Sequence, residues 1–160
     1  MKITEFINEN LILTGLAARD KAGLLGAMVD HLIAKGVIEA SRRELLTGKL
    51  MEREALSSTG IGGGVAIPHA SGERVERMVI AAARLANPVD FDAIDGQPVR
   101  LVFMIIASER APREHLQLLA AIVRALKNEE LTRKLLAAKT PRQAFEALAA
   151  HDAKGDNGRP

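Results

Sequence analysis

The longest uninterrupted run of apolar residues, Leu101 to Ala107, is the feature that most restricts how this chain can fold. Successive side chains of a strand point to opposite faces of a sheet, so a run that is apolar at every position offers no face to water. The run is also far too short to cross a bilayer, which takes about 20 apolar residues in a helix. It therefore predicts a central β-strand, residues 100–107, that is covered on both faces. A second strand is predicted for residues 78–85.

Helical patterns flank these strands. The spacing of apolar residues predicts helices over residues 20–35 and, from a capping box at Ser41 to Glu44, over 41–54. Val65 to Ile67, closed by Pro68, is typical of an edge or terminal strand. After Pro112, a stripe of Leu116, Leu119, Val123 and Leu126 predicts another helix, and shorter helices are expected over 128–137 and 140–150.

This order of elements predicts the α/β class, as a single domain with a central mixed β-sheet flanked by helices. The domain is expected to span residues 1–150. Residues 151–160 are polar and rich in Gly and charge, and they are expected to form a disordered C-terminal tail.

The composition excludes several functions. The chain has no Cys, which removes disulfides, thiolate metal sites and Cys nucleophiles. Its net charge of +2 and its lack of Tyr and Trp give little support to a nucleic-acid partner. The first residues lack the layout of a secretion signal, so we expect a cytoplasmic protein without membrane insertion.

His69 is the first of two histidines that could carry chemistry. It follows Pro68 and the glycine-rich stretch 60–64, whose backbone N–H groups could meet an anion. This stretch lacks the Gly-Lys-Ser/Thr ending of a nucleotide-binding P-loop, and no helix follows it, as a dinucleotide fingerprint would require. The alternative for His69 is an ordinary turn with a surface histidine.

His115 lies in the first turn of the helix after Pro112, where the helix dipole disfavours the charged imidazolium. A neutral ring that donates one hydrogen bond fits this position, although, taken alone, His115 is more typical of a partly exposed histidine on an amphipathic helix. Arg53 ends the second predicted helix, just before Ser57, Ser58 and Thr59. Taken alone, Arg53 is typical of a solvated charge.

The stretch from Arg53 through Ser58-Thr59-Gly60-Ile61-Gly62 to Ala66-Ile67-Pro68-His69 resembles the phosphorylation-site signature of the fructose/mannitol-type IIA domains of the bacterial phosphotransferase system. Within this family, residues 91–99 resemble the nitrogen-regulatory branch. The run from His115 to Leu119 matches the family's second histidine. The resemblance covers residues 1–150.

The resemblance implies that His69 accepts a phosphoryl group from the phosphohistidine of a small HPr-like carrier, and that His115 and Arg53 line the same pocket. Loop N–H groups near Gly62 and Gly64, together with the hydroxyl of Ser58 or Thr59, are expected to complete the phosphate cradle. No cofactor and no metal are implied. In the nitrogen-regulatory branch, the partners regulated according to phosphorylation state are transporters or sensor kinases.

Three alternatives remain at this point. A sugar-transport IIA component would pass its phosphate to a separate IIB protein. A regulatory binding module would keep the fold without being phosphorylated, although Arg53, His69 and His115 are all present. A zinc hydrolase would need a third ligand beside two histidines, and the sequence offers no suitable spacing for one. The expected activity is that of a phosphocarrier and not of a stand-alone enzyme with turnover.

Overall fold

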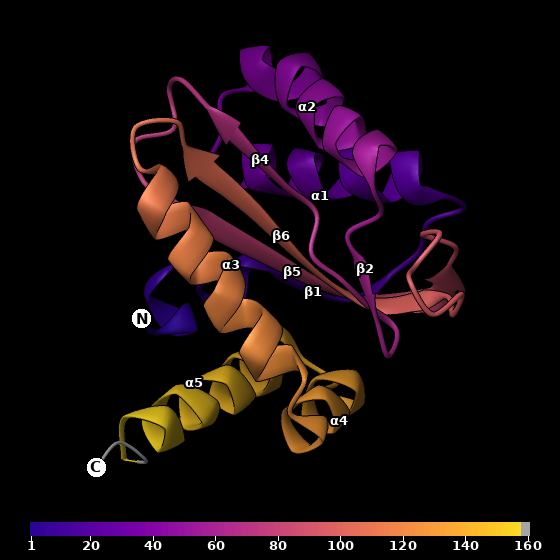
Figure 1. Ribbon diagram of the computed structural model, residues 1–160, viewed down its shortest axis with the longest axis vertical. Helices are drawn as coiled ribbons and strands as arrows, with labels where there is room; N and C mark the ends of the chain where they lie inside the picture. The colour runs from indigo at the N-terminus through magenta and orange to yellow at the C-terminus, as the bar shows by residue number, and fades with distance from the viewer. Residues whose placement is uncertain (158–160) are drawn as a thin grey trace.

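The computed structural model describes residues 1–157 (Figure 1). Its helices pack on one mixed β-sheet. The strands are β1 (Ile12–Leu16), β2 (Gly60–Gly62), β3 (Val65–Ala66), β4 (His69–Gly72), β5 (Val79–Val89) and β6 (Val99–Ser108). The helices are α1 (Lys21–Ala34), α2 (Arg43–Leu56), α3 (Pro112–Leu126), α4 (Glu129–Ala137) and α5 (Pro141–Asn157), with short 3-10 turns η1 (Ile3–Glu5), η2 (Glu9–Leu11) and η3 (Ala40–Arg42).

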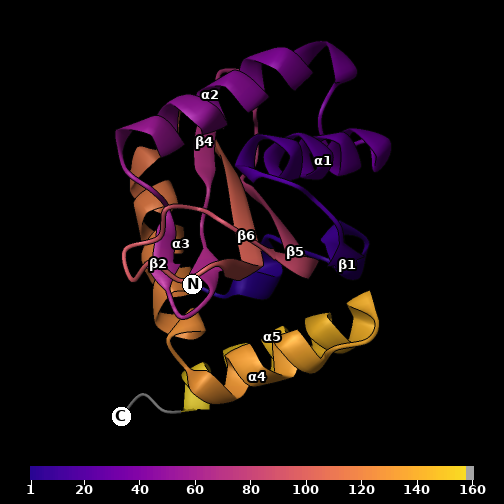
Figure 2. The ribbon, with the colours of Figure 1, turned by 90° about the vertical axis from the view of Figure 1, so that its right-hand side faces the viewer.

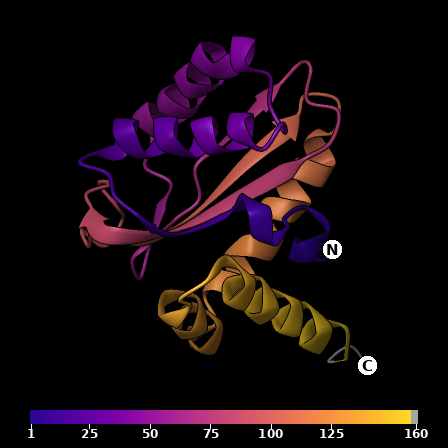
Figure 3. The ribbon, with the colours of Figure 1, turned by 180° about the vertical axis from the view of Figure 1, so that it is seen from behind.

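The sheet order is β1-β5-β6-β3-β2. Strand β4 also pairs with β6, on the same side as β3 but nearer the C-terminal end of β6. Strand β6 runs antiparallel to β5 and parallel to β3 and β4. Every residue of β6 except Arg100 is buried, which confirms the central strand predicted from the apolar run. Helices α1 and α2 cover one face, while α3, α4 and α5 lie on the other (Figures 2 and 3). No helix within residues 1–157 is both long and apolar enough to span a bilayer.

Several predicted elements differ from the structure. Strand β3 is not at an edge, because it lies between β6 and the three-residue β2. The capping box predicted at Ser41 is wrong: the turn η3 precedes α2, and no side chain caps the helix at Arg42. The predicted stripe on α3 is shifted, since Leu116 is 68% exposed, and the buried face carries Leu118, Ala121, Ile122, Ala125 and Leu126.

The expectation of a frayed tail is wrong for residues 151–157, because α5 continues through them. The carboxylate of Asp152 accepts hydrogen bonds from Ile3 N (3.2 Å), Thr4 N (2.8 Å) and Thr4 Oγ1 (2.7 Å). These contacts join α5 to the first turn of the chain. The spacing of residues does not predict these contacts, because they link the two ends of the chain. The last predicted tail residues, 158–160, lie outside the described residues.

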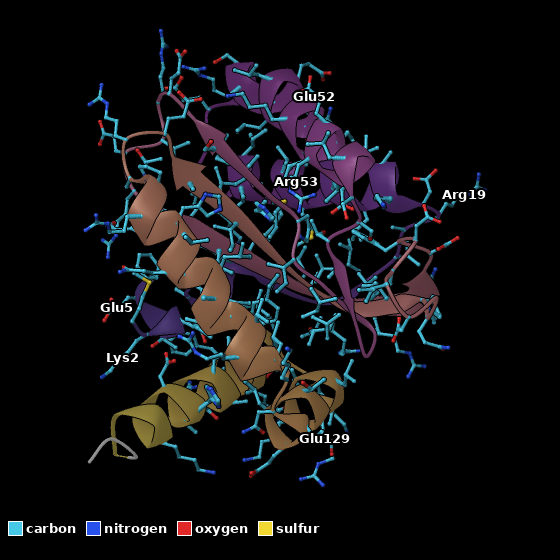
Figure 4. All side chains as sticks on the ribbon, viewed as in Figure 1. Lys2, Glu5, Arg19, Glu52, Arg53 and Glu129 are labelled. Carbon is cyan, nitrogen blue, oxygen red and sulfur yellow. The ribbon has the colours of Figure 1, made fainter. Side chains whose placement is uncertain are left out.

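We expect Asp152→Ala to lower the free energy of unfolding by about 2 kcal/mol, because two N–H groups and a hydroxyl lose a charged acceptor. In a chain of this size the melting temperature should fall by roughly 5 °C. The measurement is thermal unfolding followed by circular dichroism. The matched control is Glu52→Ala, which removes an exposed carboxylate from α2 (Figure 4). Equal melting temperatures for the two variants would contradict a structural role for Asp152.

Candidate functional site

His69 is the first residue of β4, and the backbone at Pro68 and His69 is held by β6. Ile105 N of β6 donates to Pro68 O (3.0 Å), and His69 itself pairs with Ile105 in the parallel ladder. Its Nδ1 lies 2.9 Å from Ile67 O. Because a carbonyl can only accept a hydrogen bond, Nδ1 carries the proton in this contact. Nε2 of His69 therefore holds the free lone pair and is the nucleophilic atom of the ring.

His115 lies against His69, as the predicted shared pocket requires. It is the fourth residue of α3, and its ring meets that of His69 edge to face, with the two centroids 5.4 Å apart. Its Nε2 is buried and has no hydrogen-bond partner within residues 1–157. A buried polar atom without a partner is costly, so a ligand that satisfies it is stabilised at this position.

Arg53 lies in the last turn of α2 and is partly exposed. Its Nη1 donates to Ser57 O (2.6 Å), which leaves the other donors of the guanidinium for a ligand. In the view of Figure 4, Arg53 lies toward the middle of the molecule, and its neighbour Glu52 lies at the outer rim. The positive charge of Arg53 acts on the ring of His69, so the structure brings together all three predicted residues.

Both histidines are held neutral. Burial is the largest influence on the pKa of His69 and lowers it; the hydrogen bond to Ile67 O opposes this effect, and the smaller effects of Arg53 and Glu54 lower and raise the pKa respectively. Burial also lowers the pKa of His115, assisted by the neighbouring His69. At neutral pH the site therefore contains an uncharged nucleophile beside a guanidinium, an arrangement suited to receiving an anionic group.

These shifts predict that stability decreases as pH falls below about 6.5, the ordinary pKa of histidine. The two rings bind protons more weakly in the folded chain than in the unfolded one, so acid favours unfolding. The measurement is urea unfolding at pH 7.5 and at pH 5.5. The decrease should be smaller in a His69→Gln/His115→Gln variant. An identical pH dependence in the variant would show that other groups cause it.

The two hydroxyls predicted to bind phosphate are already engaged. Ser58 Oγ donates to Phe91 O and accepts from Gly60 N (3.0 Å). Thr59 is buried, and its Oγ1 donates to Glu54 Oε1. Both side chains hold the loop after α2 in place within the free protein.

The structure does not bring Gly62 and Gly64 to the histidine ring. Gly62 ends β2 and Gly64 lies in the turn before β3, and their positive φ angles of 96° and 79° favour glycine. Gly64 O accepts from Leu101 N, whereas His69 pairs with Ile105. Four residues of β6 separate these positions, or about 13 Å along the strand. These glycines shape the hairpin.

Sequence reasoning missed Glu54, a buried carboxylate beside Arg53, and Lys21, which pairs with it across 3.1 Å. Glu54 directly follows Arg53 in sequence, but nothing in the pattern reveals that its side chain is buried. The exposed Leu116, one residue after His115, was assigned to the core instead of the surface around the site.

A cavity of about 940 Å³ lies elsewhere and includes none of the three site residues. It is lined by residues of η1, the turn after α1, the first part of α2 and the β4–β5 loop, among them Phe6, Val37, Leu45 and Val75. Within residues 1–157 no group of three or more acidic or histidine side chains is arranged to hold a metal ion.

Comparisons with known proteins identify the family of this chain. The sequence profile of the family described as "Phosphoenolpyruvate-dependent sugar phosphotransferase system, EIIA 2" matches residues 5–151. A nitrogen regulatory protein of Bradyrhizobium diazoefficiens is 36% identical over 150 residues, which cover 93% of this chain and 95% of that protein. The fructose-specific EIIABC component of Bacillus subtilis is also 36% identical, over 95% of this chain, but the chain spans only 24% of that protein's length.

Solved structures show the same fold. The nitrogen regulatory protein IIA-Ntr from Neisseria meningitidis superposes with a TM-score of 0.82 at 29% identity, over 91% of this chain and 98% of that one. The mannitol enzyme IIA of Escherichia coli, solved in complex with phosphorylated enzyme IIB, superposes with a TM-score of 0.74 at 24% identity, over 91% and 97% of the two chains. The single α/β domain with a mixed sheet is thereby confirmed, and the chain belongs to the EIIA type 2 family of the phosphoenolpyruvate-dependent sugar phosphotransferase system.

Proposed function

We propose that Nε2 of His69 accepts a phosphoryl group from the phosphohistidine of an HPr-like carrier, and that the protein regulates its partners according to its phosphorylation state. The proposal is supported most directly by the contact between His69 Nδ1 and Ile67 O, which leaves Nε2 free on a neutral ring. Membership of the EIIA type 2 family makes the protein a phosphocarrier domain. The donor and the regulatory role are our proposal.

The proposed transfer forms one N–P bond and breaks another. The lone pair of His69 Nε2 attacks phosphorus, a new N–P bond forms, and the N–P bond to the donor histidine breaks, returning its electron pair to the donor ring. Throughout the transfer the proton stays on Nδ1, which donates it in a hydrogen bond to Ile67 O. In the transition state negative charge is spread over three phosphoryl oxygens, so positioning and positive potential matter more than acid–base catalysis. Arg53 can meet two of these oxygens and His115 Nε2, as an N–H donor, can meet the third.

Regulation would follow from charge. A phosphohistidine adds close to two negative charges beside Arg53, which reverses the local potential. A partner that places acidic residues over His69 would then lose affinity, and the loss would decrease as salt screens the charges. Transporters and sensor kinases are the proposed partners, as the resemblance to the nitrogen-regulatory branch implies.

A sugar-transport role is the second candidate, because the fructose-specific relative is equally identical in sequence. In that case the phosphoryl group would pass from His69 to a separate IIB protein. Both roles use the same acceptor atom and differ in the protein that discharges it.

The test begins with ³²P-labelled phosphoenolpyruvate, an enzyme I and an HPr-like carrier. We expect one acid-labile phosphate per chain, assigned to His69 Nε2 by NMR of the ¹⁵N-labelled ring. Addition of IIB proteins from the same genome then separates the two roles: persistent label supports regulation, and rapid discharge supports sugar transport. Absence of label, or label on Nδ1, would contradict the proposal.

A further inference from the structure

A second charged cluster lies beneath the end of α2, next to the site. Glu54 is 5% exposed, and both its carboxylate oxygens are occupied. Oε1 accepts from Thr59 Oγ1, and Oε2 accepts from Thr59 N (3.2 Å) and from Lys21 Nζ (3.1 Å). The ammonium of Lys21 also lies 4.9 Å from the ring centroid of the buried Phe91. The cluster thus joins α1, α2, the loop after α2 and the segment after β5.

This cluster fixes the same loop that Arg53 uses. Arg53 donates to Ser57 O, and Glu54, its neighbour in sequence, holds Thr59 through both the amide and the hydroxyl. The loop between these contacts therefore cannot move without breaking hydrogen bonds to a buried carboxylate, which cost more than bonds between neutral groups. The position of the Arg53 side chain depends on this anchorage.

The carboxylate of Glu54 that anchors the loop is itself a negative charge that acts on the phosphoryl site. The negative charge of Glu54 reaches His69, whose pKa it raises, against the effect of Arg53. A carboxylate whose charge acts on the acceptor would also repel an incoming phosphoryl group, which is itself an anion. Lys21, with a side chain only 16% exposed, is the cation in direct contact with that carboxylate.

We propose that Lys21 is a positioning residue of the phosphoryl site: its ammonium neutralises Glu54, so that Glu54 can anchor the Arg53 loop without opposing the arrival of the phosphoryl group. This inference rests on the proposed function for its kinetic consequence. Its electrostatic consequence, the proton affinity of His69, can be measured in the unphosphorylated protein. The charged and titratable groups that act on His69 there are Arg53 and Glu54 from α2 and His115 from α3.

The experiment compares Lys21→Met, Glu54→Gln and the double variant with the wild type. Lys21→Met leaves Glu54 uncompensated, so we expect a higher pKa of His69 by NMR titration and phosphorylation slowed by about tenfold. Glu54→Gln should lower the pKa of His69. The double variant removes both charges while keeping an acceptor for Thr59, so it should recover most of the rate and a pKa near that of the wild type. Lys35→Met, at the exposed end of α1, is the matched control and should behave as the wild type.

The outcomes separate this inference from the proposed function. A role in folding alone would leave the pKa of His69 unchanged and would make the double variant no faster than Lys21→Met. Either result, in variants shown to be folded by their amide NMR spectra, would overturn the inference. If Lys21→Met does not fold, the double variant alone decides, because a folded double variant with a slow rate also contradicts compensation. If the wild type takes up no phosphate, the proposed function fails, while the pKa shifts still test the role of Lys21.

Discussion

His69→Gln should abolish the acid-labile phosphate that the wild type acquires from phosphoenolpyruvate, enzyme I and an HPr-like carrier. The side-chain amide of glutamine can still donate to Ile67 O, as His69 Nδ1 does in the wild type. It has no nucleophilic nitrogen, however, because the amide lone pair is delocalised. We therefore expect a folded protein without an acceptor, and label below the detection limit after an hour in which the wild type is fully labelled.

His31→Gln is the matched control for this experiment. His31 lies in α1, and its Nε2 contacts Asn10 O (2.7 Å), so this histidine is tied to η2 and not to the site. It should be labelled as fast as the wild type. Undiminished labelling of His69→Gln would refute the assignment, and label transferred to His115 in that variant would show that the second ring can serve as an acceptor.

The sequence predicts well the parts of this fold that bury long apolar patterns. The run from Leu101 to Ala107 required cover on both faces, and β6 has it. Asp20 and Asn128 are the first residues of two predicted helices, and in the structure each side chain caps its helix by accepting a hydrogen bond from the third residue after it, Gly23 N and Leu131 N. These features are local, so the residues concerned specify them almost alone.

Features that depend on distant partners were not predictable in this way. Strands β2 and β4 are too short to show alternation, and they exist because β3 and β6 supply their ladders. Asp152 looks like one more polar residue of a tail until Ile3 and Thr4 are placed beside it. A pattern based on spacing cannot bring together residues from opposite ends of the chain.

The candidate site also has parts that the sequence predicts and parts that depend on distant residues. The Pro68-His69 motif with Arg53 and His115 was recognised from sequence, and the structure places the three residues together. The resemblance implies a phosphate-binding role for Gly62 and Gly64, but these glycines belong to the hairpin of β2 and β3, at a distance from His69 set by the register of β3 and β6. Glu54 was missed because a glutamate in the last turn of a helix is usually exposed, and only the positions of Lys21 and Thr59 explain its burial.

Arg53→Ala and His115→Ala should each slow phosphorylation of His69 by about 10²-fold, the usual effect of removing one donor that stabilises transition-state charge. The two side chains would stabilise the transition state in different ways. Arg53 supplies a full charge beside His69, whereas His115 supplies a buried neutral ring whose Nε2 has no partner within the described residues. Rapid-mixing labelling at saturating carrier measures the rate, and thermal unfolding shows whether each variant keeps its fold.

Two comparisons separate a chemical role from a structural one. Arg53→Lys keeps the charge but loses the paired N–H groups, so it should recover only part of the rate. Arg133→Ala removes an exposed arginine from α4, remote from the site in sequence, and should leave the rate unchanged. If both donors act on the same phosphoryl group, the double variant should be slowed by less than the product of the single effects, because each donor is worth less once the other no longer holds the group in place. Wild-type rates in Arg53→Ala and His115→Ala with native melting temperatures would show that neither side chain contacts the phosphoryl group in transfer.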